Sequence, residues 1–228
     1  MKKLIEHYSE YKMLFSENEN NLQEYRKFRF GRLKHEFWLK SRKNKDYVYI
    51  DEYDKFILDN LNPGKTCYFC SAGYYMEELI EDLTVVETRK VVKSFYPDAV
   101  IVKDREEFAN RFETTFDNFV VVNNRSDHWT TLEGLYEHLS NYSKTLKNNG
   151  LLFYSFRDTQ IQNIHRLMMD QEQLFLTFAK LLSRKQLYLE QHNIQFATKE
   201  KDPDGNYDFL ENPDTTNGNI KFVFRKKV

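Results

Sequence analysis

The sequence predicts an α/β fold built on a mostly parallel sheet, and three observations support this fold class. Five short apolar runs follow one another between residues 66 and 156. Helical stretches alternate with them, as expected for strands that are buried on both faces. A turn of small residues follows the first run, and an acidic residue ends the second and the third. In a parallel sheet such positions gather at the carboxyl ends of the strands, where ligands bind.

The order of the predicted elements follows from these runs and from the turn residues between them. Strands are expected within Thr66–Gly73, Leu83–Glu87, Ala99–Asp104, Phe116–Asn123 and Asn148–Phe156, with a helix over Leu132–Leu146. A long amphipathic helix is predicted for Thr159–Arg184, followed by strands at Leu187–Thr198 and Asn219–Arg225. Turn signals between the last two strands predict an antiparallel edge on the sheet.

Residues 1–60 are predicted to form a helical N-terminal segment packed on the core, and residues 61–228 to form the α/β domain. Apolar residues recur at helical spacing in two stripes of this segment, namely Leu4, Tyr8, Tyr11 and Phe15, and Tyr53, Phe56, Ile57 and Leu61. A polar break over residues 16–21 separates the first stripe from a second helix that is expected to start near Leu22.

Composition narrows the class of protein. The 228 residues are 40% hydrophobic and carry a formal net charge of -1, so the chain is globular and is not a generic polyanion binder. No apolar run approaches the ~20 residues that span a bilayer, and the N-terminus lacks an apolar signal-peptide core. We therefore expect a soluble, intracellular protein of the cytoplasm.

Two sequence patterns suggest metal or redox chemistry, and both have simpler interpretations. Cys67 and Cys70 form a C-x-x-C pair, but no second pair completes a zinc site, and strand side chains at i and i+3 point to opposite faces. We interpret them as two thiols of a core strand, in keeping with a reducing compartment. The segment 202–208 resembles a calcium loop, yet its twelfth position is Pro213 instead of a bidentate Glu. No metal site is predicted.

The order of these elements resembles that of the class I S-adenosylmethionine-dependent methyltransferase family. It begins with a strand and turn, two strands that end in acids, and a fourth strand. A helix, a Gly-turn with the fifth strand and a terminal hairpin follow. The resemblance covers about residues 60–228, and its closest echoes are Phe116–Trp129 and Leu139–Leu152. It implies a Rossmann-like methyltransferase fold with an antiparallel C-terminal hairpin strand, and S-adenosylmethionine as the cofactor.

The resemblance also implies a cofactor site. Glu87 would hold the two ribose hydroxyls, since one carboxylate accepts two hydrogen bonds and suits a vicinal diol. Asp104 matches the acid near the adenine amine. Ser71 and Gly73 would lie in the turn that passes the methionine end, and Asn123 in the loop after the fourth strand. The alternative to a role in cofactor binding is that Glu87 and Asp104 are ordinary exposed acids at strand ends.

The first turn departs from the family pattern of an acid followed by three alternating glycines. The acid position falls on Phe69, and the glycine positions fall on Ser71, Gly73 and Tyr75. Glycines let the backbone approach a cofactor closely, whereas Tyr75 could fill the space of the methionine moiety. Two hypotheses follow: a divergent methyltransferase of unknown acceptor, or an inactive methyltransferase-fold binding module.

The acceptor is not specified by any motif. His128, in the loop after the fourth strand, is the one weak candidate for a general base, because its pKa lies near neutrality. A packed or solvated histidine is the alternative. The Asn/Asp-Pro-Pro-aromatic motif for amino groups on bases is missing, which disfavours methylation of nucleic-acid bases.

Residues 26–45 form a basic segment with nine Lys or Arg and one acid, a formal +8. It predicts a contact with nucleic acid or an acidic protein, with aromatic side chains stacking on bases. The predicted contacts are Arg26, Arg29, Arg32, Lys34 and Arg42. The alternative is an amphipathic helix whose aromatic residues face the core and whose basic face is solvated.

Overall fold

The computed structural model of the chain describes residues 2–27, 40–70, 73–94, 96–122, 132–157, 177, 179–194 and 219–227. These residues fall in two compact units. Unit 1 contains the described parts of residues 1–60 and 74–81, and unit 2 contains those of residues 61–73, 82–196 and 218–228.

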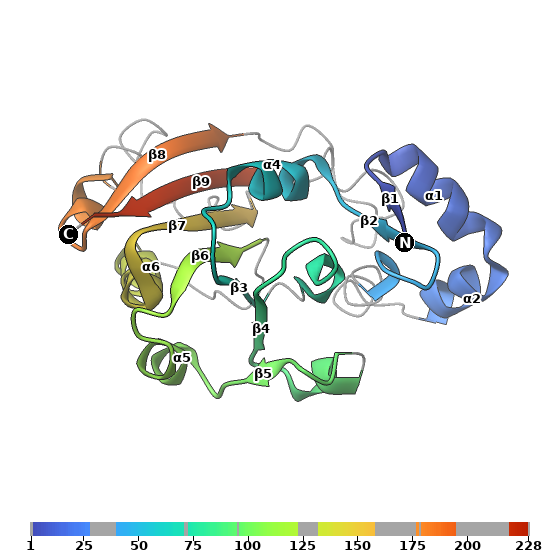
Figure 1. Ribbon diagram of the computed structural model, residues 1–228, viewed down its shortest axis with the longest axis horizontal. Helices are drawn as coiled ribbons and strands as arrows, with labels where there is room; N and C mark the ends of the chain where they lie inside the picture. Colours follow the sequence, from blue (N-terminus) through green and yellow to red (C-terminus); the bar gives the residue numbers. More distant parts are fainter. Residues whose placement is uncertain are drawn as a thin grey trace. The chain divides into compact units, whose positions relative to one another are not determined.

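Unit 2 is built on a seven-stranded sheet in the order β5-β4-β3-β6-β7-β9-β8, with β5 and β8 at its edges (Figure 1). Its strands are β3 (Thr66–Phe69), β4 (Leu83–Glu87), β5 (Val100–Ile101), β6 (Phe116–Val121), β7 (Leu146–Arg157), β8 (Leu187–Ile194) and β9 (Asn219–Lys226). Strands β3 to β7 are parallel, and β9 is antiparallel to both β7 and β8. The predicted fold class is confirmed.

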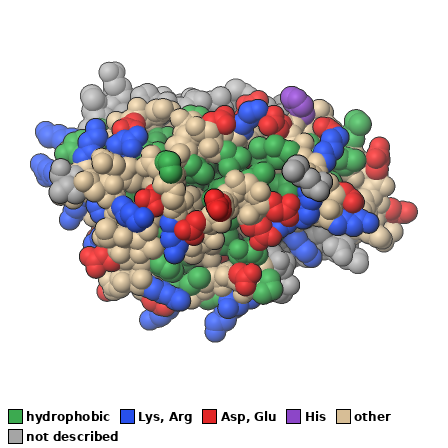
Figure 2. Space-filling model, viewed as in Figure 1, with side chains coloured by type: hydrophobic (Ala, Val, Ile, Leu, Met, Phe, Trp, Pro, Cys, Tyr) green, Lys and Arg blue, Asp and Glu red, His purple; other side chains and the backbone are tan. Residues whose placement is uncertain are grey.

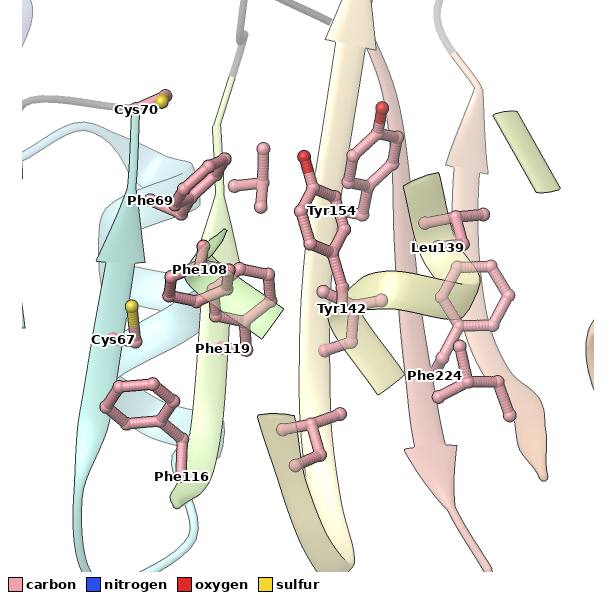
Figure 3. Packing of buried hydrophobic residues seen from close by; sticks show 14 of the residues in the cluster. Cys67, Phe69, Cys70, Phe108, Phe116, Phe119, Leu139, Tyr142, Tyr154 and Phe224 are labelled. Carbon is pink, nitrogen blue, oxygen red and sulfur yellow. The ribbon is translucent and has the colours of Figure 1, made fainter. Parts of the chain in front are cut away.

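Helices α5 (Arg105–Arg111) and α6 (Leu132–Thr145) contribute to the core on one face of this sheet. Strand alternation turns Phe69 and Phe119 toward that face, where their rings meet Phe108 and Tyr142 (Figure 3). The ring centroid of Phe69 lies 4.6 Å from that of Phe108 and 5.6 Å from that of Tyr142. Burying aromatic rings of this size supplies much of the free energy that holds helices to a sheet.

The opposite face of the central strands is buried as well. Tyr68, Val85, Val120 and Phe153 alternate with the residues of the core just described, and each is at most 1% exposed. Burial on both faces explains why these strands read as continuous apolar runs without alternating polar residues. That pattern is why their positions were predictable.

The turn before β3 is held at the amino ends of the strands. Asp117 Oδ2 accepts hydrogen bonds from the Lys65 backbone N–H at 2.8 Å and from Lys147 Nζ at 2.8 Å. Gly64 has φ +118°, and a Cβ there would lie 2.3 Å from Asp117 Oδ2. Glycine is therefore required for the close approach of this turn to the carboxylate.

Unit 1 combines helices with a two-stranded parallel sheet. Its elements are β1 (Lys3–Ile5), α1 (Tyr8–Glu17), α2 (Glu19–Lys27), β2 (Tyr47–Tyr49) and α4 (Glu52–Asn60). The two strands were not expected, and the prediction that Leu4 belongs to the buried stripe of a first helix was wrong. Leu4 lies in β1, pairs with Val48 and is 42% exposed. Pairing with a strand more than forty residues away overrides the local helical spacing.

Several predicted segments lie wholly or partly outside the described residues. Most of the expected helix Thr159–Arg184 does, although residues 179–183 are helical. The turn signals between β8 and β9 also lie outside. Within the described part of the chain, no helix has both the length and the apolar character needed to cross a membrane.

Candidate functional site

The carboxyl ends of β3, β4 and β5 meet at one edge of the unit 2 sheet. The register pairs Phe69 with Val86, and Glu87 with Ile101. The pairing continues just past the strands, because the Cys70 N–H donates to the Val86 carbonyl at 2.8 Å and the Val102 N–H donates to the Glu87 carbonyl at 3.0 Å. Segments that follow three neighbouring strands are thereby brought to the same edge, which is the candidate site.

Glu87 is the last residue of β4, and its side chain is fully buried. Arg89, two residues later, donates from Nε to Glu87 Oε2 at 3.1 Å and from Nη2 to Glu87 Oε1 at 2.8 Å. This is a bidentate pair, the arrangement in which a guanidinium holds a carboxylate most specifically. The alternative of an ordinary exposed acid does not describe Glu87, and both of its oxygens are engaged within the chain.

Asp104 follows β5 and begins helix α5. Its carboxylate accepts from the Glu107 N–H at 2.9 Å, while Glu107 accepts from the Lys103 N–H at 2.7 Å. These bonds satisfy backbone donors at the start of α5. The Asp104 side chain is 49% exposed, so it also remains open to solvent at this edge.

The turn after β3 is described in part. Gly73 begins the 3-10 helix η1 (Gly73–Met76), and a Cβ added there would lie 2.1 Å from Cδ1 of Tyr68. Gly73 therefore packs directly against the Tyr68 ring, which explains a glycine at this position. Ser71, Asn123 and His128 lie outside the described residues, so their predicted roles remain predictions.

The backbone at Cys70 contradicts the prediction that the two thiols lie on opposite faces of one strand. Strand β3 ends at Phe69, and Cys70 has a left-handed φ of 51°, so alternation no longer applies to it. Cys67 and Cys70 belong to the same buried cluster (Figure 3). Burial raises the pKa of the Cys67 thiol well above its ordinary value, which keeps it protonated and unreactive. Among the described residues no group of His, Cys, Asp and Glu could hold a metal ion.

The two residues that replace the family's acid and third glycine have different surroundings. Phe69 is buried in the aromatic core of unit 2. Tyr75 belongs to unit 1, where its ring lies 4.2 Å from the Arg42 guanidinium carbon and its hydroxyl donates to Asp54 Oδ1 at 3.0 Å. The side chain of Tyr75 is thus committed to partners inside unit 1.

The surroundings of Arg42 contradict the prediction that this residue contacts nucleic acid or an acidic protein. Its side chain is 2% exposed, and its guanidinium pairs with the carboxylates of Asp54 and Asp51. Burial opposes the charged form, but the Asp54 carboxylate raises the pKa of Arg42 well above its ordinary value. Lys43 pairs with Glu77, so it too is engaged within the unit. On the face drawn in Figure 2, basic and acidic side chains are interspersed.

The predicted contacts Arg29, Arg32 and Lys34 lie outside the described residues, and so does the side chain of Arg26.

Arg89 is the residue of the candidate site that sequence reasoning missed. The available signal was Glu87-Thr88-Arg89 at the end of a predicted strand. In an extended chain, side chains at i and i+2 share one side, so opposite charges at that spacing can pair.

Comparison with known protein structures identifies the fold of the chain. No protein-family model matches the chain, and no curated protein sequence matches it. It is similar to the structure of a 16S rRNA (adenine(1408)-N(1))-methyltransferase from Catenulisporales acidiphilia with cosubstrate SAM (TM-score 0.51, 12% identity, 78% of this chain and 92% of that chain). It also matches N-methyltransferase NodS from Bradyrhizobium japonicum (TM-score 0.48, 14% identity, 78% and 93%). The chain has the fold of class I SAM-dependent methyltransferases.

Proposed function

We propose that the chain is an S-adenosylmethionine-dependent methyltransferase, and its residues do not specify the methyl acceptor. The observation that carries the proposal is the position of Glu87 at the carboxyl end of β4, beside the turn that follows β3. A carboxylate at that point offers two oxygens to the two hydroxyls of a ribose. The shared fold supports the same edge of the sheet as the ligand-binding edge.

Two described residues would hold the nucleoside half of the cofactor once Arg89 leaves the Glu87 carboxylate, both of whose oxygens it occupies in this structure. Glu87 would hold the ribose and Asp104, half exposed at the same edge, would reach the adenine amine. Gly73 would let the backbone pass close to the methionine half. When bound, the cofactor supplies an activated methyl group, and the protein contributes mainly by positioning it in line with a nucleophile.

Calorimetric titration with S-adenosylmethionine and S-adenosylhomocysteine tests this proposal. We expect measurable binding by the unaltered protein and at least a tenfold weaker affinity in Glu87→Ala. The matched control is Glu190→Ala, which removes an acid paired with an arginine in the same unit, on strand β8. Absence of heat at millimolar ligand would reject the proposal, and so would an equal loss in both variants.

A second candidate is a methyltransferase-fold module that no longer catalyses. The observation that favours it is Tyr75, because a buried tyrosine stands at the family's third glycine position. Such a module would act through Arg26, Arg29, Arg32 and Lys34 on nucleic acid or an acidic protein. Binding to single-stranded RNA should then weaken steeply with salt, and Arg29→Ala with Lys34→Ala should flatten that slope. Binding that is absent or independent of salt would reject the nucleic-acid form.

A further inference from the structure

We propose that Arg89 gates the nucleoside site: a ligand with a ribose diol binds only when Arg89 moves off the carboxylate of Glu87. The inference rests on the proposed function and adds a residue that sets the affinity of that site. Glu87 and Arg89 both belong to unit 2.

Arg89 occupies both oxygens of a buried carboxylate. Arg89 uses one donor on each oxygen of Glu87, at 3.1 and 2.8 Å. The side chain of Glu87 is 0% exposed, whereas that of Arg89 is 19% exposed. A ligand diol therefore has to compete with the guanidinium for the same two oxygens.

The pair joins two residues that are close in the sequence. Arg89 follows the end of β4 by two residues, so its side chain can rotate about its own bonds while the strand stays paired with β3 and β5. Opening has an energetic cost, since a buried carboxylate loses a charged partner and gains two neutral hydroxyl donors. That cost is subtracted from the binding free energy of the ligand.

Shortening Arg89 should therefore tighten binding. In Arg89→Ala we expect the Kd for S-adenosylhomocysteine to fall at least tenfold. In Arg89→Lys we expect a smaller fall, because an ammonium is a point donor that does not span both oxygens in a fork. The lysine variant keeps the charge beside Glu87, so it carries the test if the alanine variant does not fold.

Isothermal titration with S-adenosylhomocysteine and with its 2′-deoxy analogue is the experiment. Circular dichroism first verifies that each variant is folded. The gain in Arg89→Ala should be absent in the double variant Glu87→Gln/Arg89→Ala and should be smaller for the analogue, which lacks one hydroxyl. Arg225→Ala is the matched control: Arg225 forms a bidentate pair with Glu190 at 2.6 and 2.9 Å on strands β9 and β8, and its loss should not change the Kd.

The possible outcomes separate this inference from the proposed function. Binding by the unaltered protein that stays equal or weakens in both Arg89 variants overturns the gate and leaves the methyltransferase proposal intact. Binding that appears only when Arg89 is replaced supports the gate and rejects the proposed function, because the unaltered protein then has no working cofactor site. No binding by any variant overturns both, because a released Glu87 would then not create a nucleoside site.

Discussion

Both units of the protein contain an arginine that pairs with a buried carboxylate, but the two pairs are supported differently. In unit 1, Arg42 donates to the Tyr49 carbonyl, contacts the Tyr75 hydroxyl and pairs with Asp54, residues that lie 7 to 33 positions away in the sequence. In unit 2, Arg89 pairs with Glu87 only two positions away. The bonds of Arg42 join distant segments, whereas the bidentate bond of Arg89 joins neighbouring residues at the carboxyl end of β4.

This difference separates a scaffold from a candidate switch. Arg42 lies between the rings of its own unit, with its guanidinium carbon 4.2 Å from the Tyr75 ring and 4.9 Å from the Tyr49 ring, and it is 2% exposed. Movement of Arg42 would break contacts among several segments at once. Arg89 retains a solvent-facing side, so it can leave its acid without disturbing strand pairing. Mutations in the two pairs should therefore differ in their effects on stability.

The largest expected effect follows from removing Arg42. In Arg42→Ala the carboxylate of Asp54 stays buried without its ion-pair partner, and we expect a loss of about 3–5 kcal/mol in the free energy of unfolding. Urea denaturation followed by circular dichroism measures this loss. Arg225→Ala, which breaks a partly exposed pair, should cost about 1 kcal/mol or less. A loss of that small size in Arg42→Ala would contradict the scaffold interpretation.

Removal of Arg89 should cost less than removal of Arg42. We expect about 1–3 kcal/mol for Arg89→Ala, the usual cost of leaving buried hydrogen-bond acceptors without their partner. The same urea titration compares the two variants directly. If Arg89→Ala destabilised the fold more than Arg42→Ala, the local pair would be part of the scaffold, and the distinction between the two regions would fail.

Tyr75→Phe tests the contribution of the Tyr75 hydroxyl to the stability of unit 1 without removing a charge. The variant keeps the ring beside Arg42 but loses the hydroxyl that donates to Asp54 and accepts from Arg42. We expect a loss of about 1.5 kcal/mol in unfolding free energy, from one hydrogen bond to a charged group. Tyr188→Phe, at an exposed tyrosine, is the control and should be neutral. An unchanged stability of Tyr75→Phe would remove the hydroxyl from the network.

The smallest effect is expected at Asp117, a third acid that is only partly buried. Burial opposes its charged form, but hydrogen bonds from Lys147 and from the Lys65 backbone lower its pKa below the ordinary value. A carboxyl with a lowered folded pKa stabilises the fold above its unfolded pKa of about 4, and this contribution is lost as the pH falls through the folded value. Asp117→Asn should cost about 1 kcal/mol at pH 7 and progressively less in acid.

Unfolding in urea at pH 7 and at pH 3 measures this dependence. Asp98→Asn, at an exposed aspartate, should show no such difference between the two conditions. A cost of Asp117→Asn that grows in acid would have the wrong sign and would contradict the assignment of the lowered pKa.

The strands of the sheet were predictable because their signals are local. Leu83–Glu87 was predicted with both ends as observed, and β9 begins at Asn219 as expected. Short apolar runs bounded by turns or acids leave few alternatives when both faces of a strand are buried. The predicted strand pair before the C-terminus was recognisable for the same reason, and so was the edge at which Glu87 and Asp104 lie.

The errors arose where a distant contact or a local change of backbone decided the result. Leu4 matched a helical stripe, yet pairing with β2 made it a strand residue. Cys70 was assigned by strand alternation, but a left-handed backbone ended the strand before it. Arg42 was placed with its basic neighbours, although its guanidinium is buried among partners from other segments. None of these outcomes is encoded in the spacing of nearby residues.

By itself the sequence determined the strand positions, the fold class and the edge of the sheet where Glu87 and Asp104 lie, because burial and turn chemistry act over a few residues. Only the tertiary structure decided which charged side chains are paired within the chain and which remain exposed to solvent. Opposite charges pair according to proximity in space, and burial strengthens the pairs that form. Arg42 thereby became part of a scaffold, and Glu87 became an acid that Arg89 holds at the candidate site.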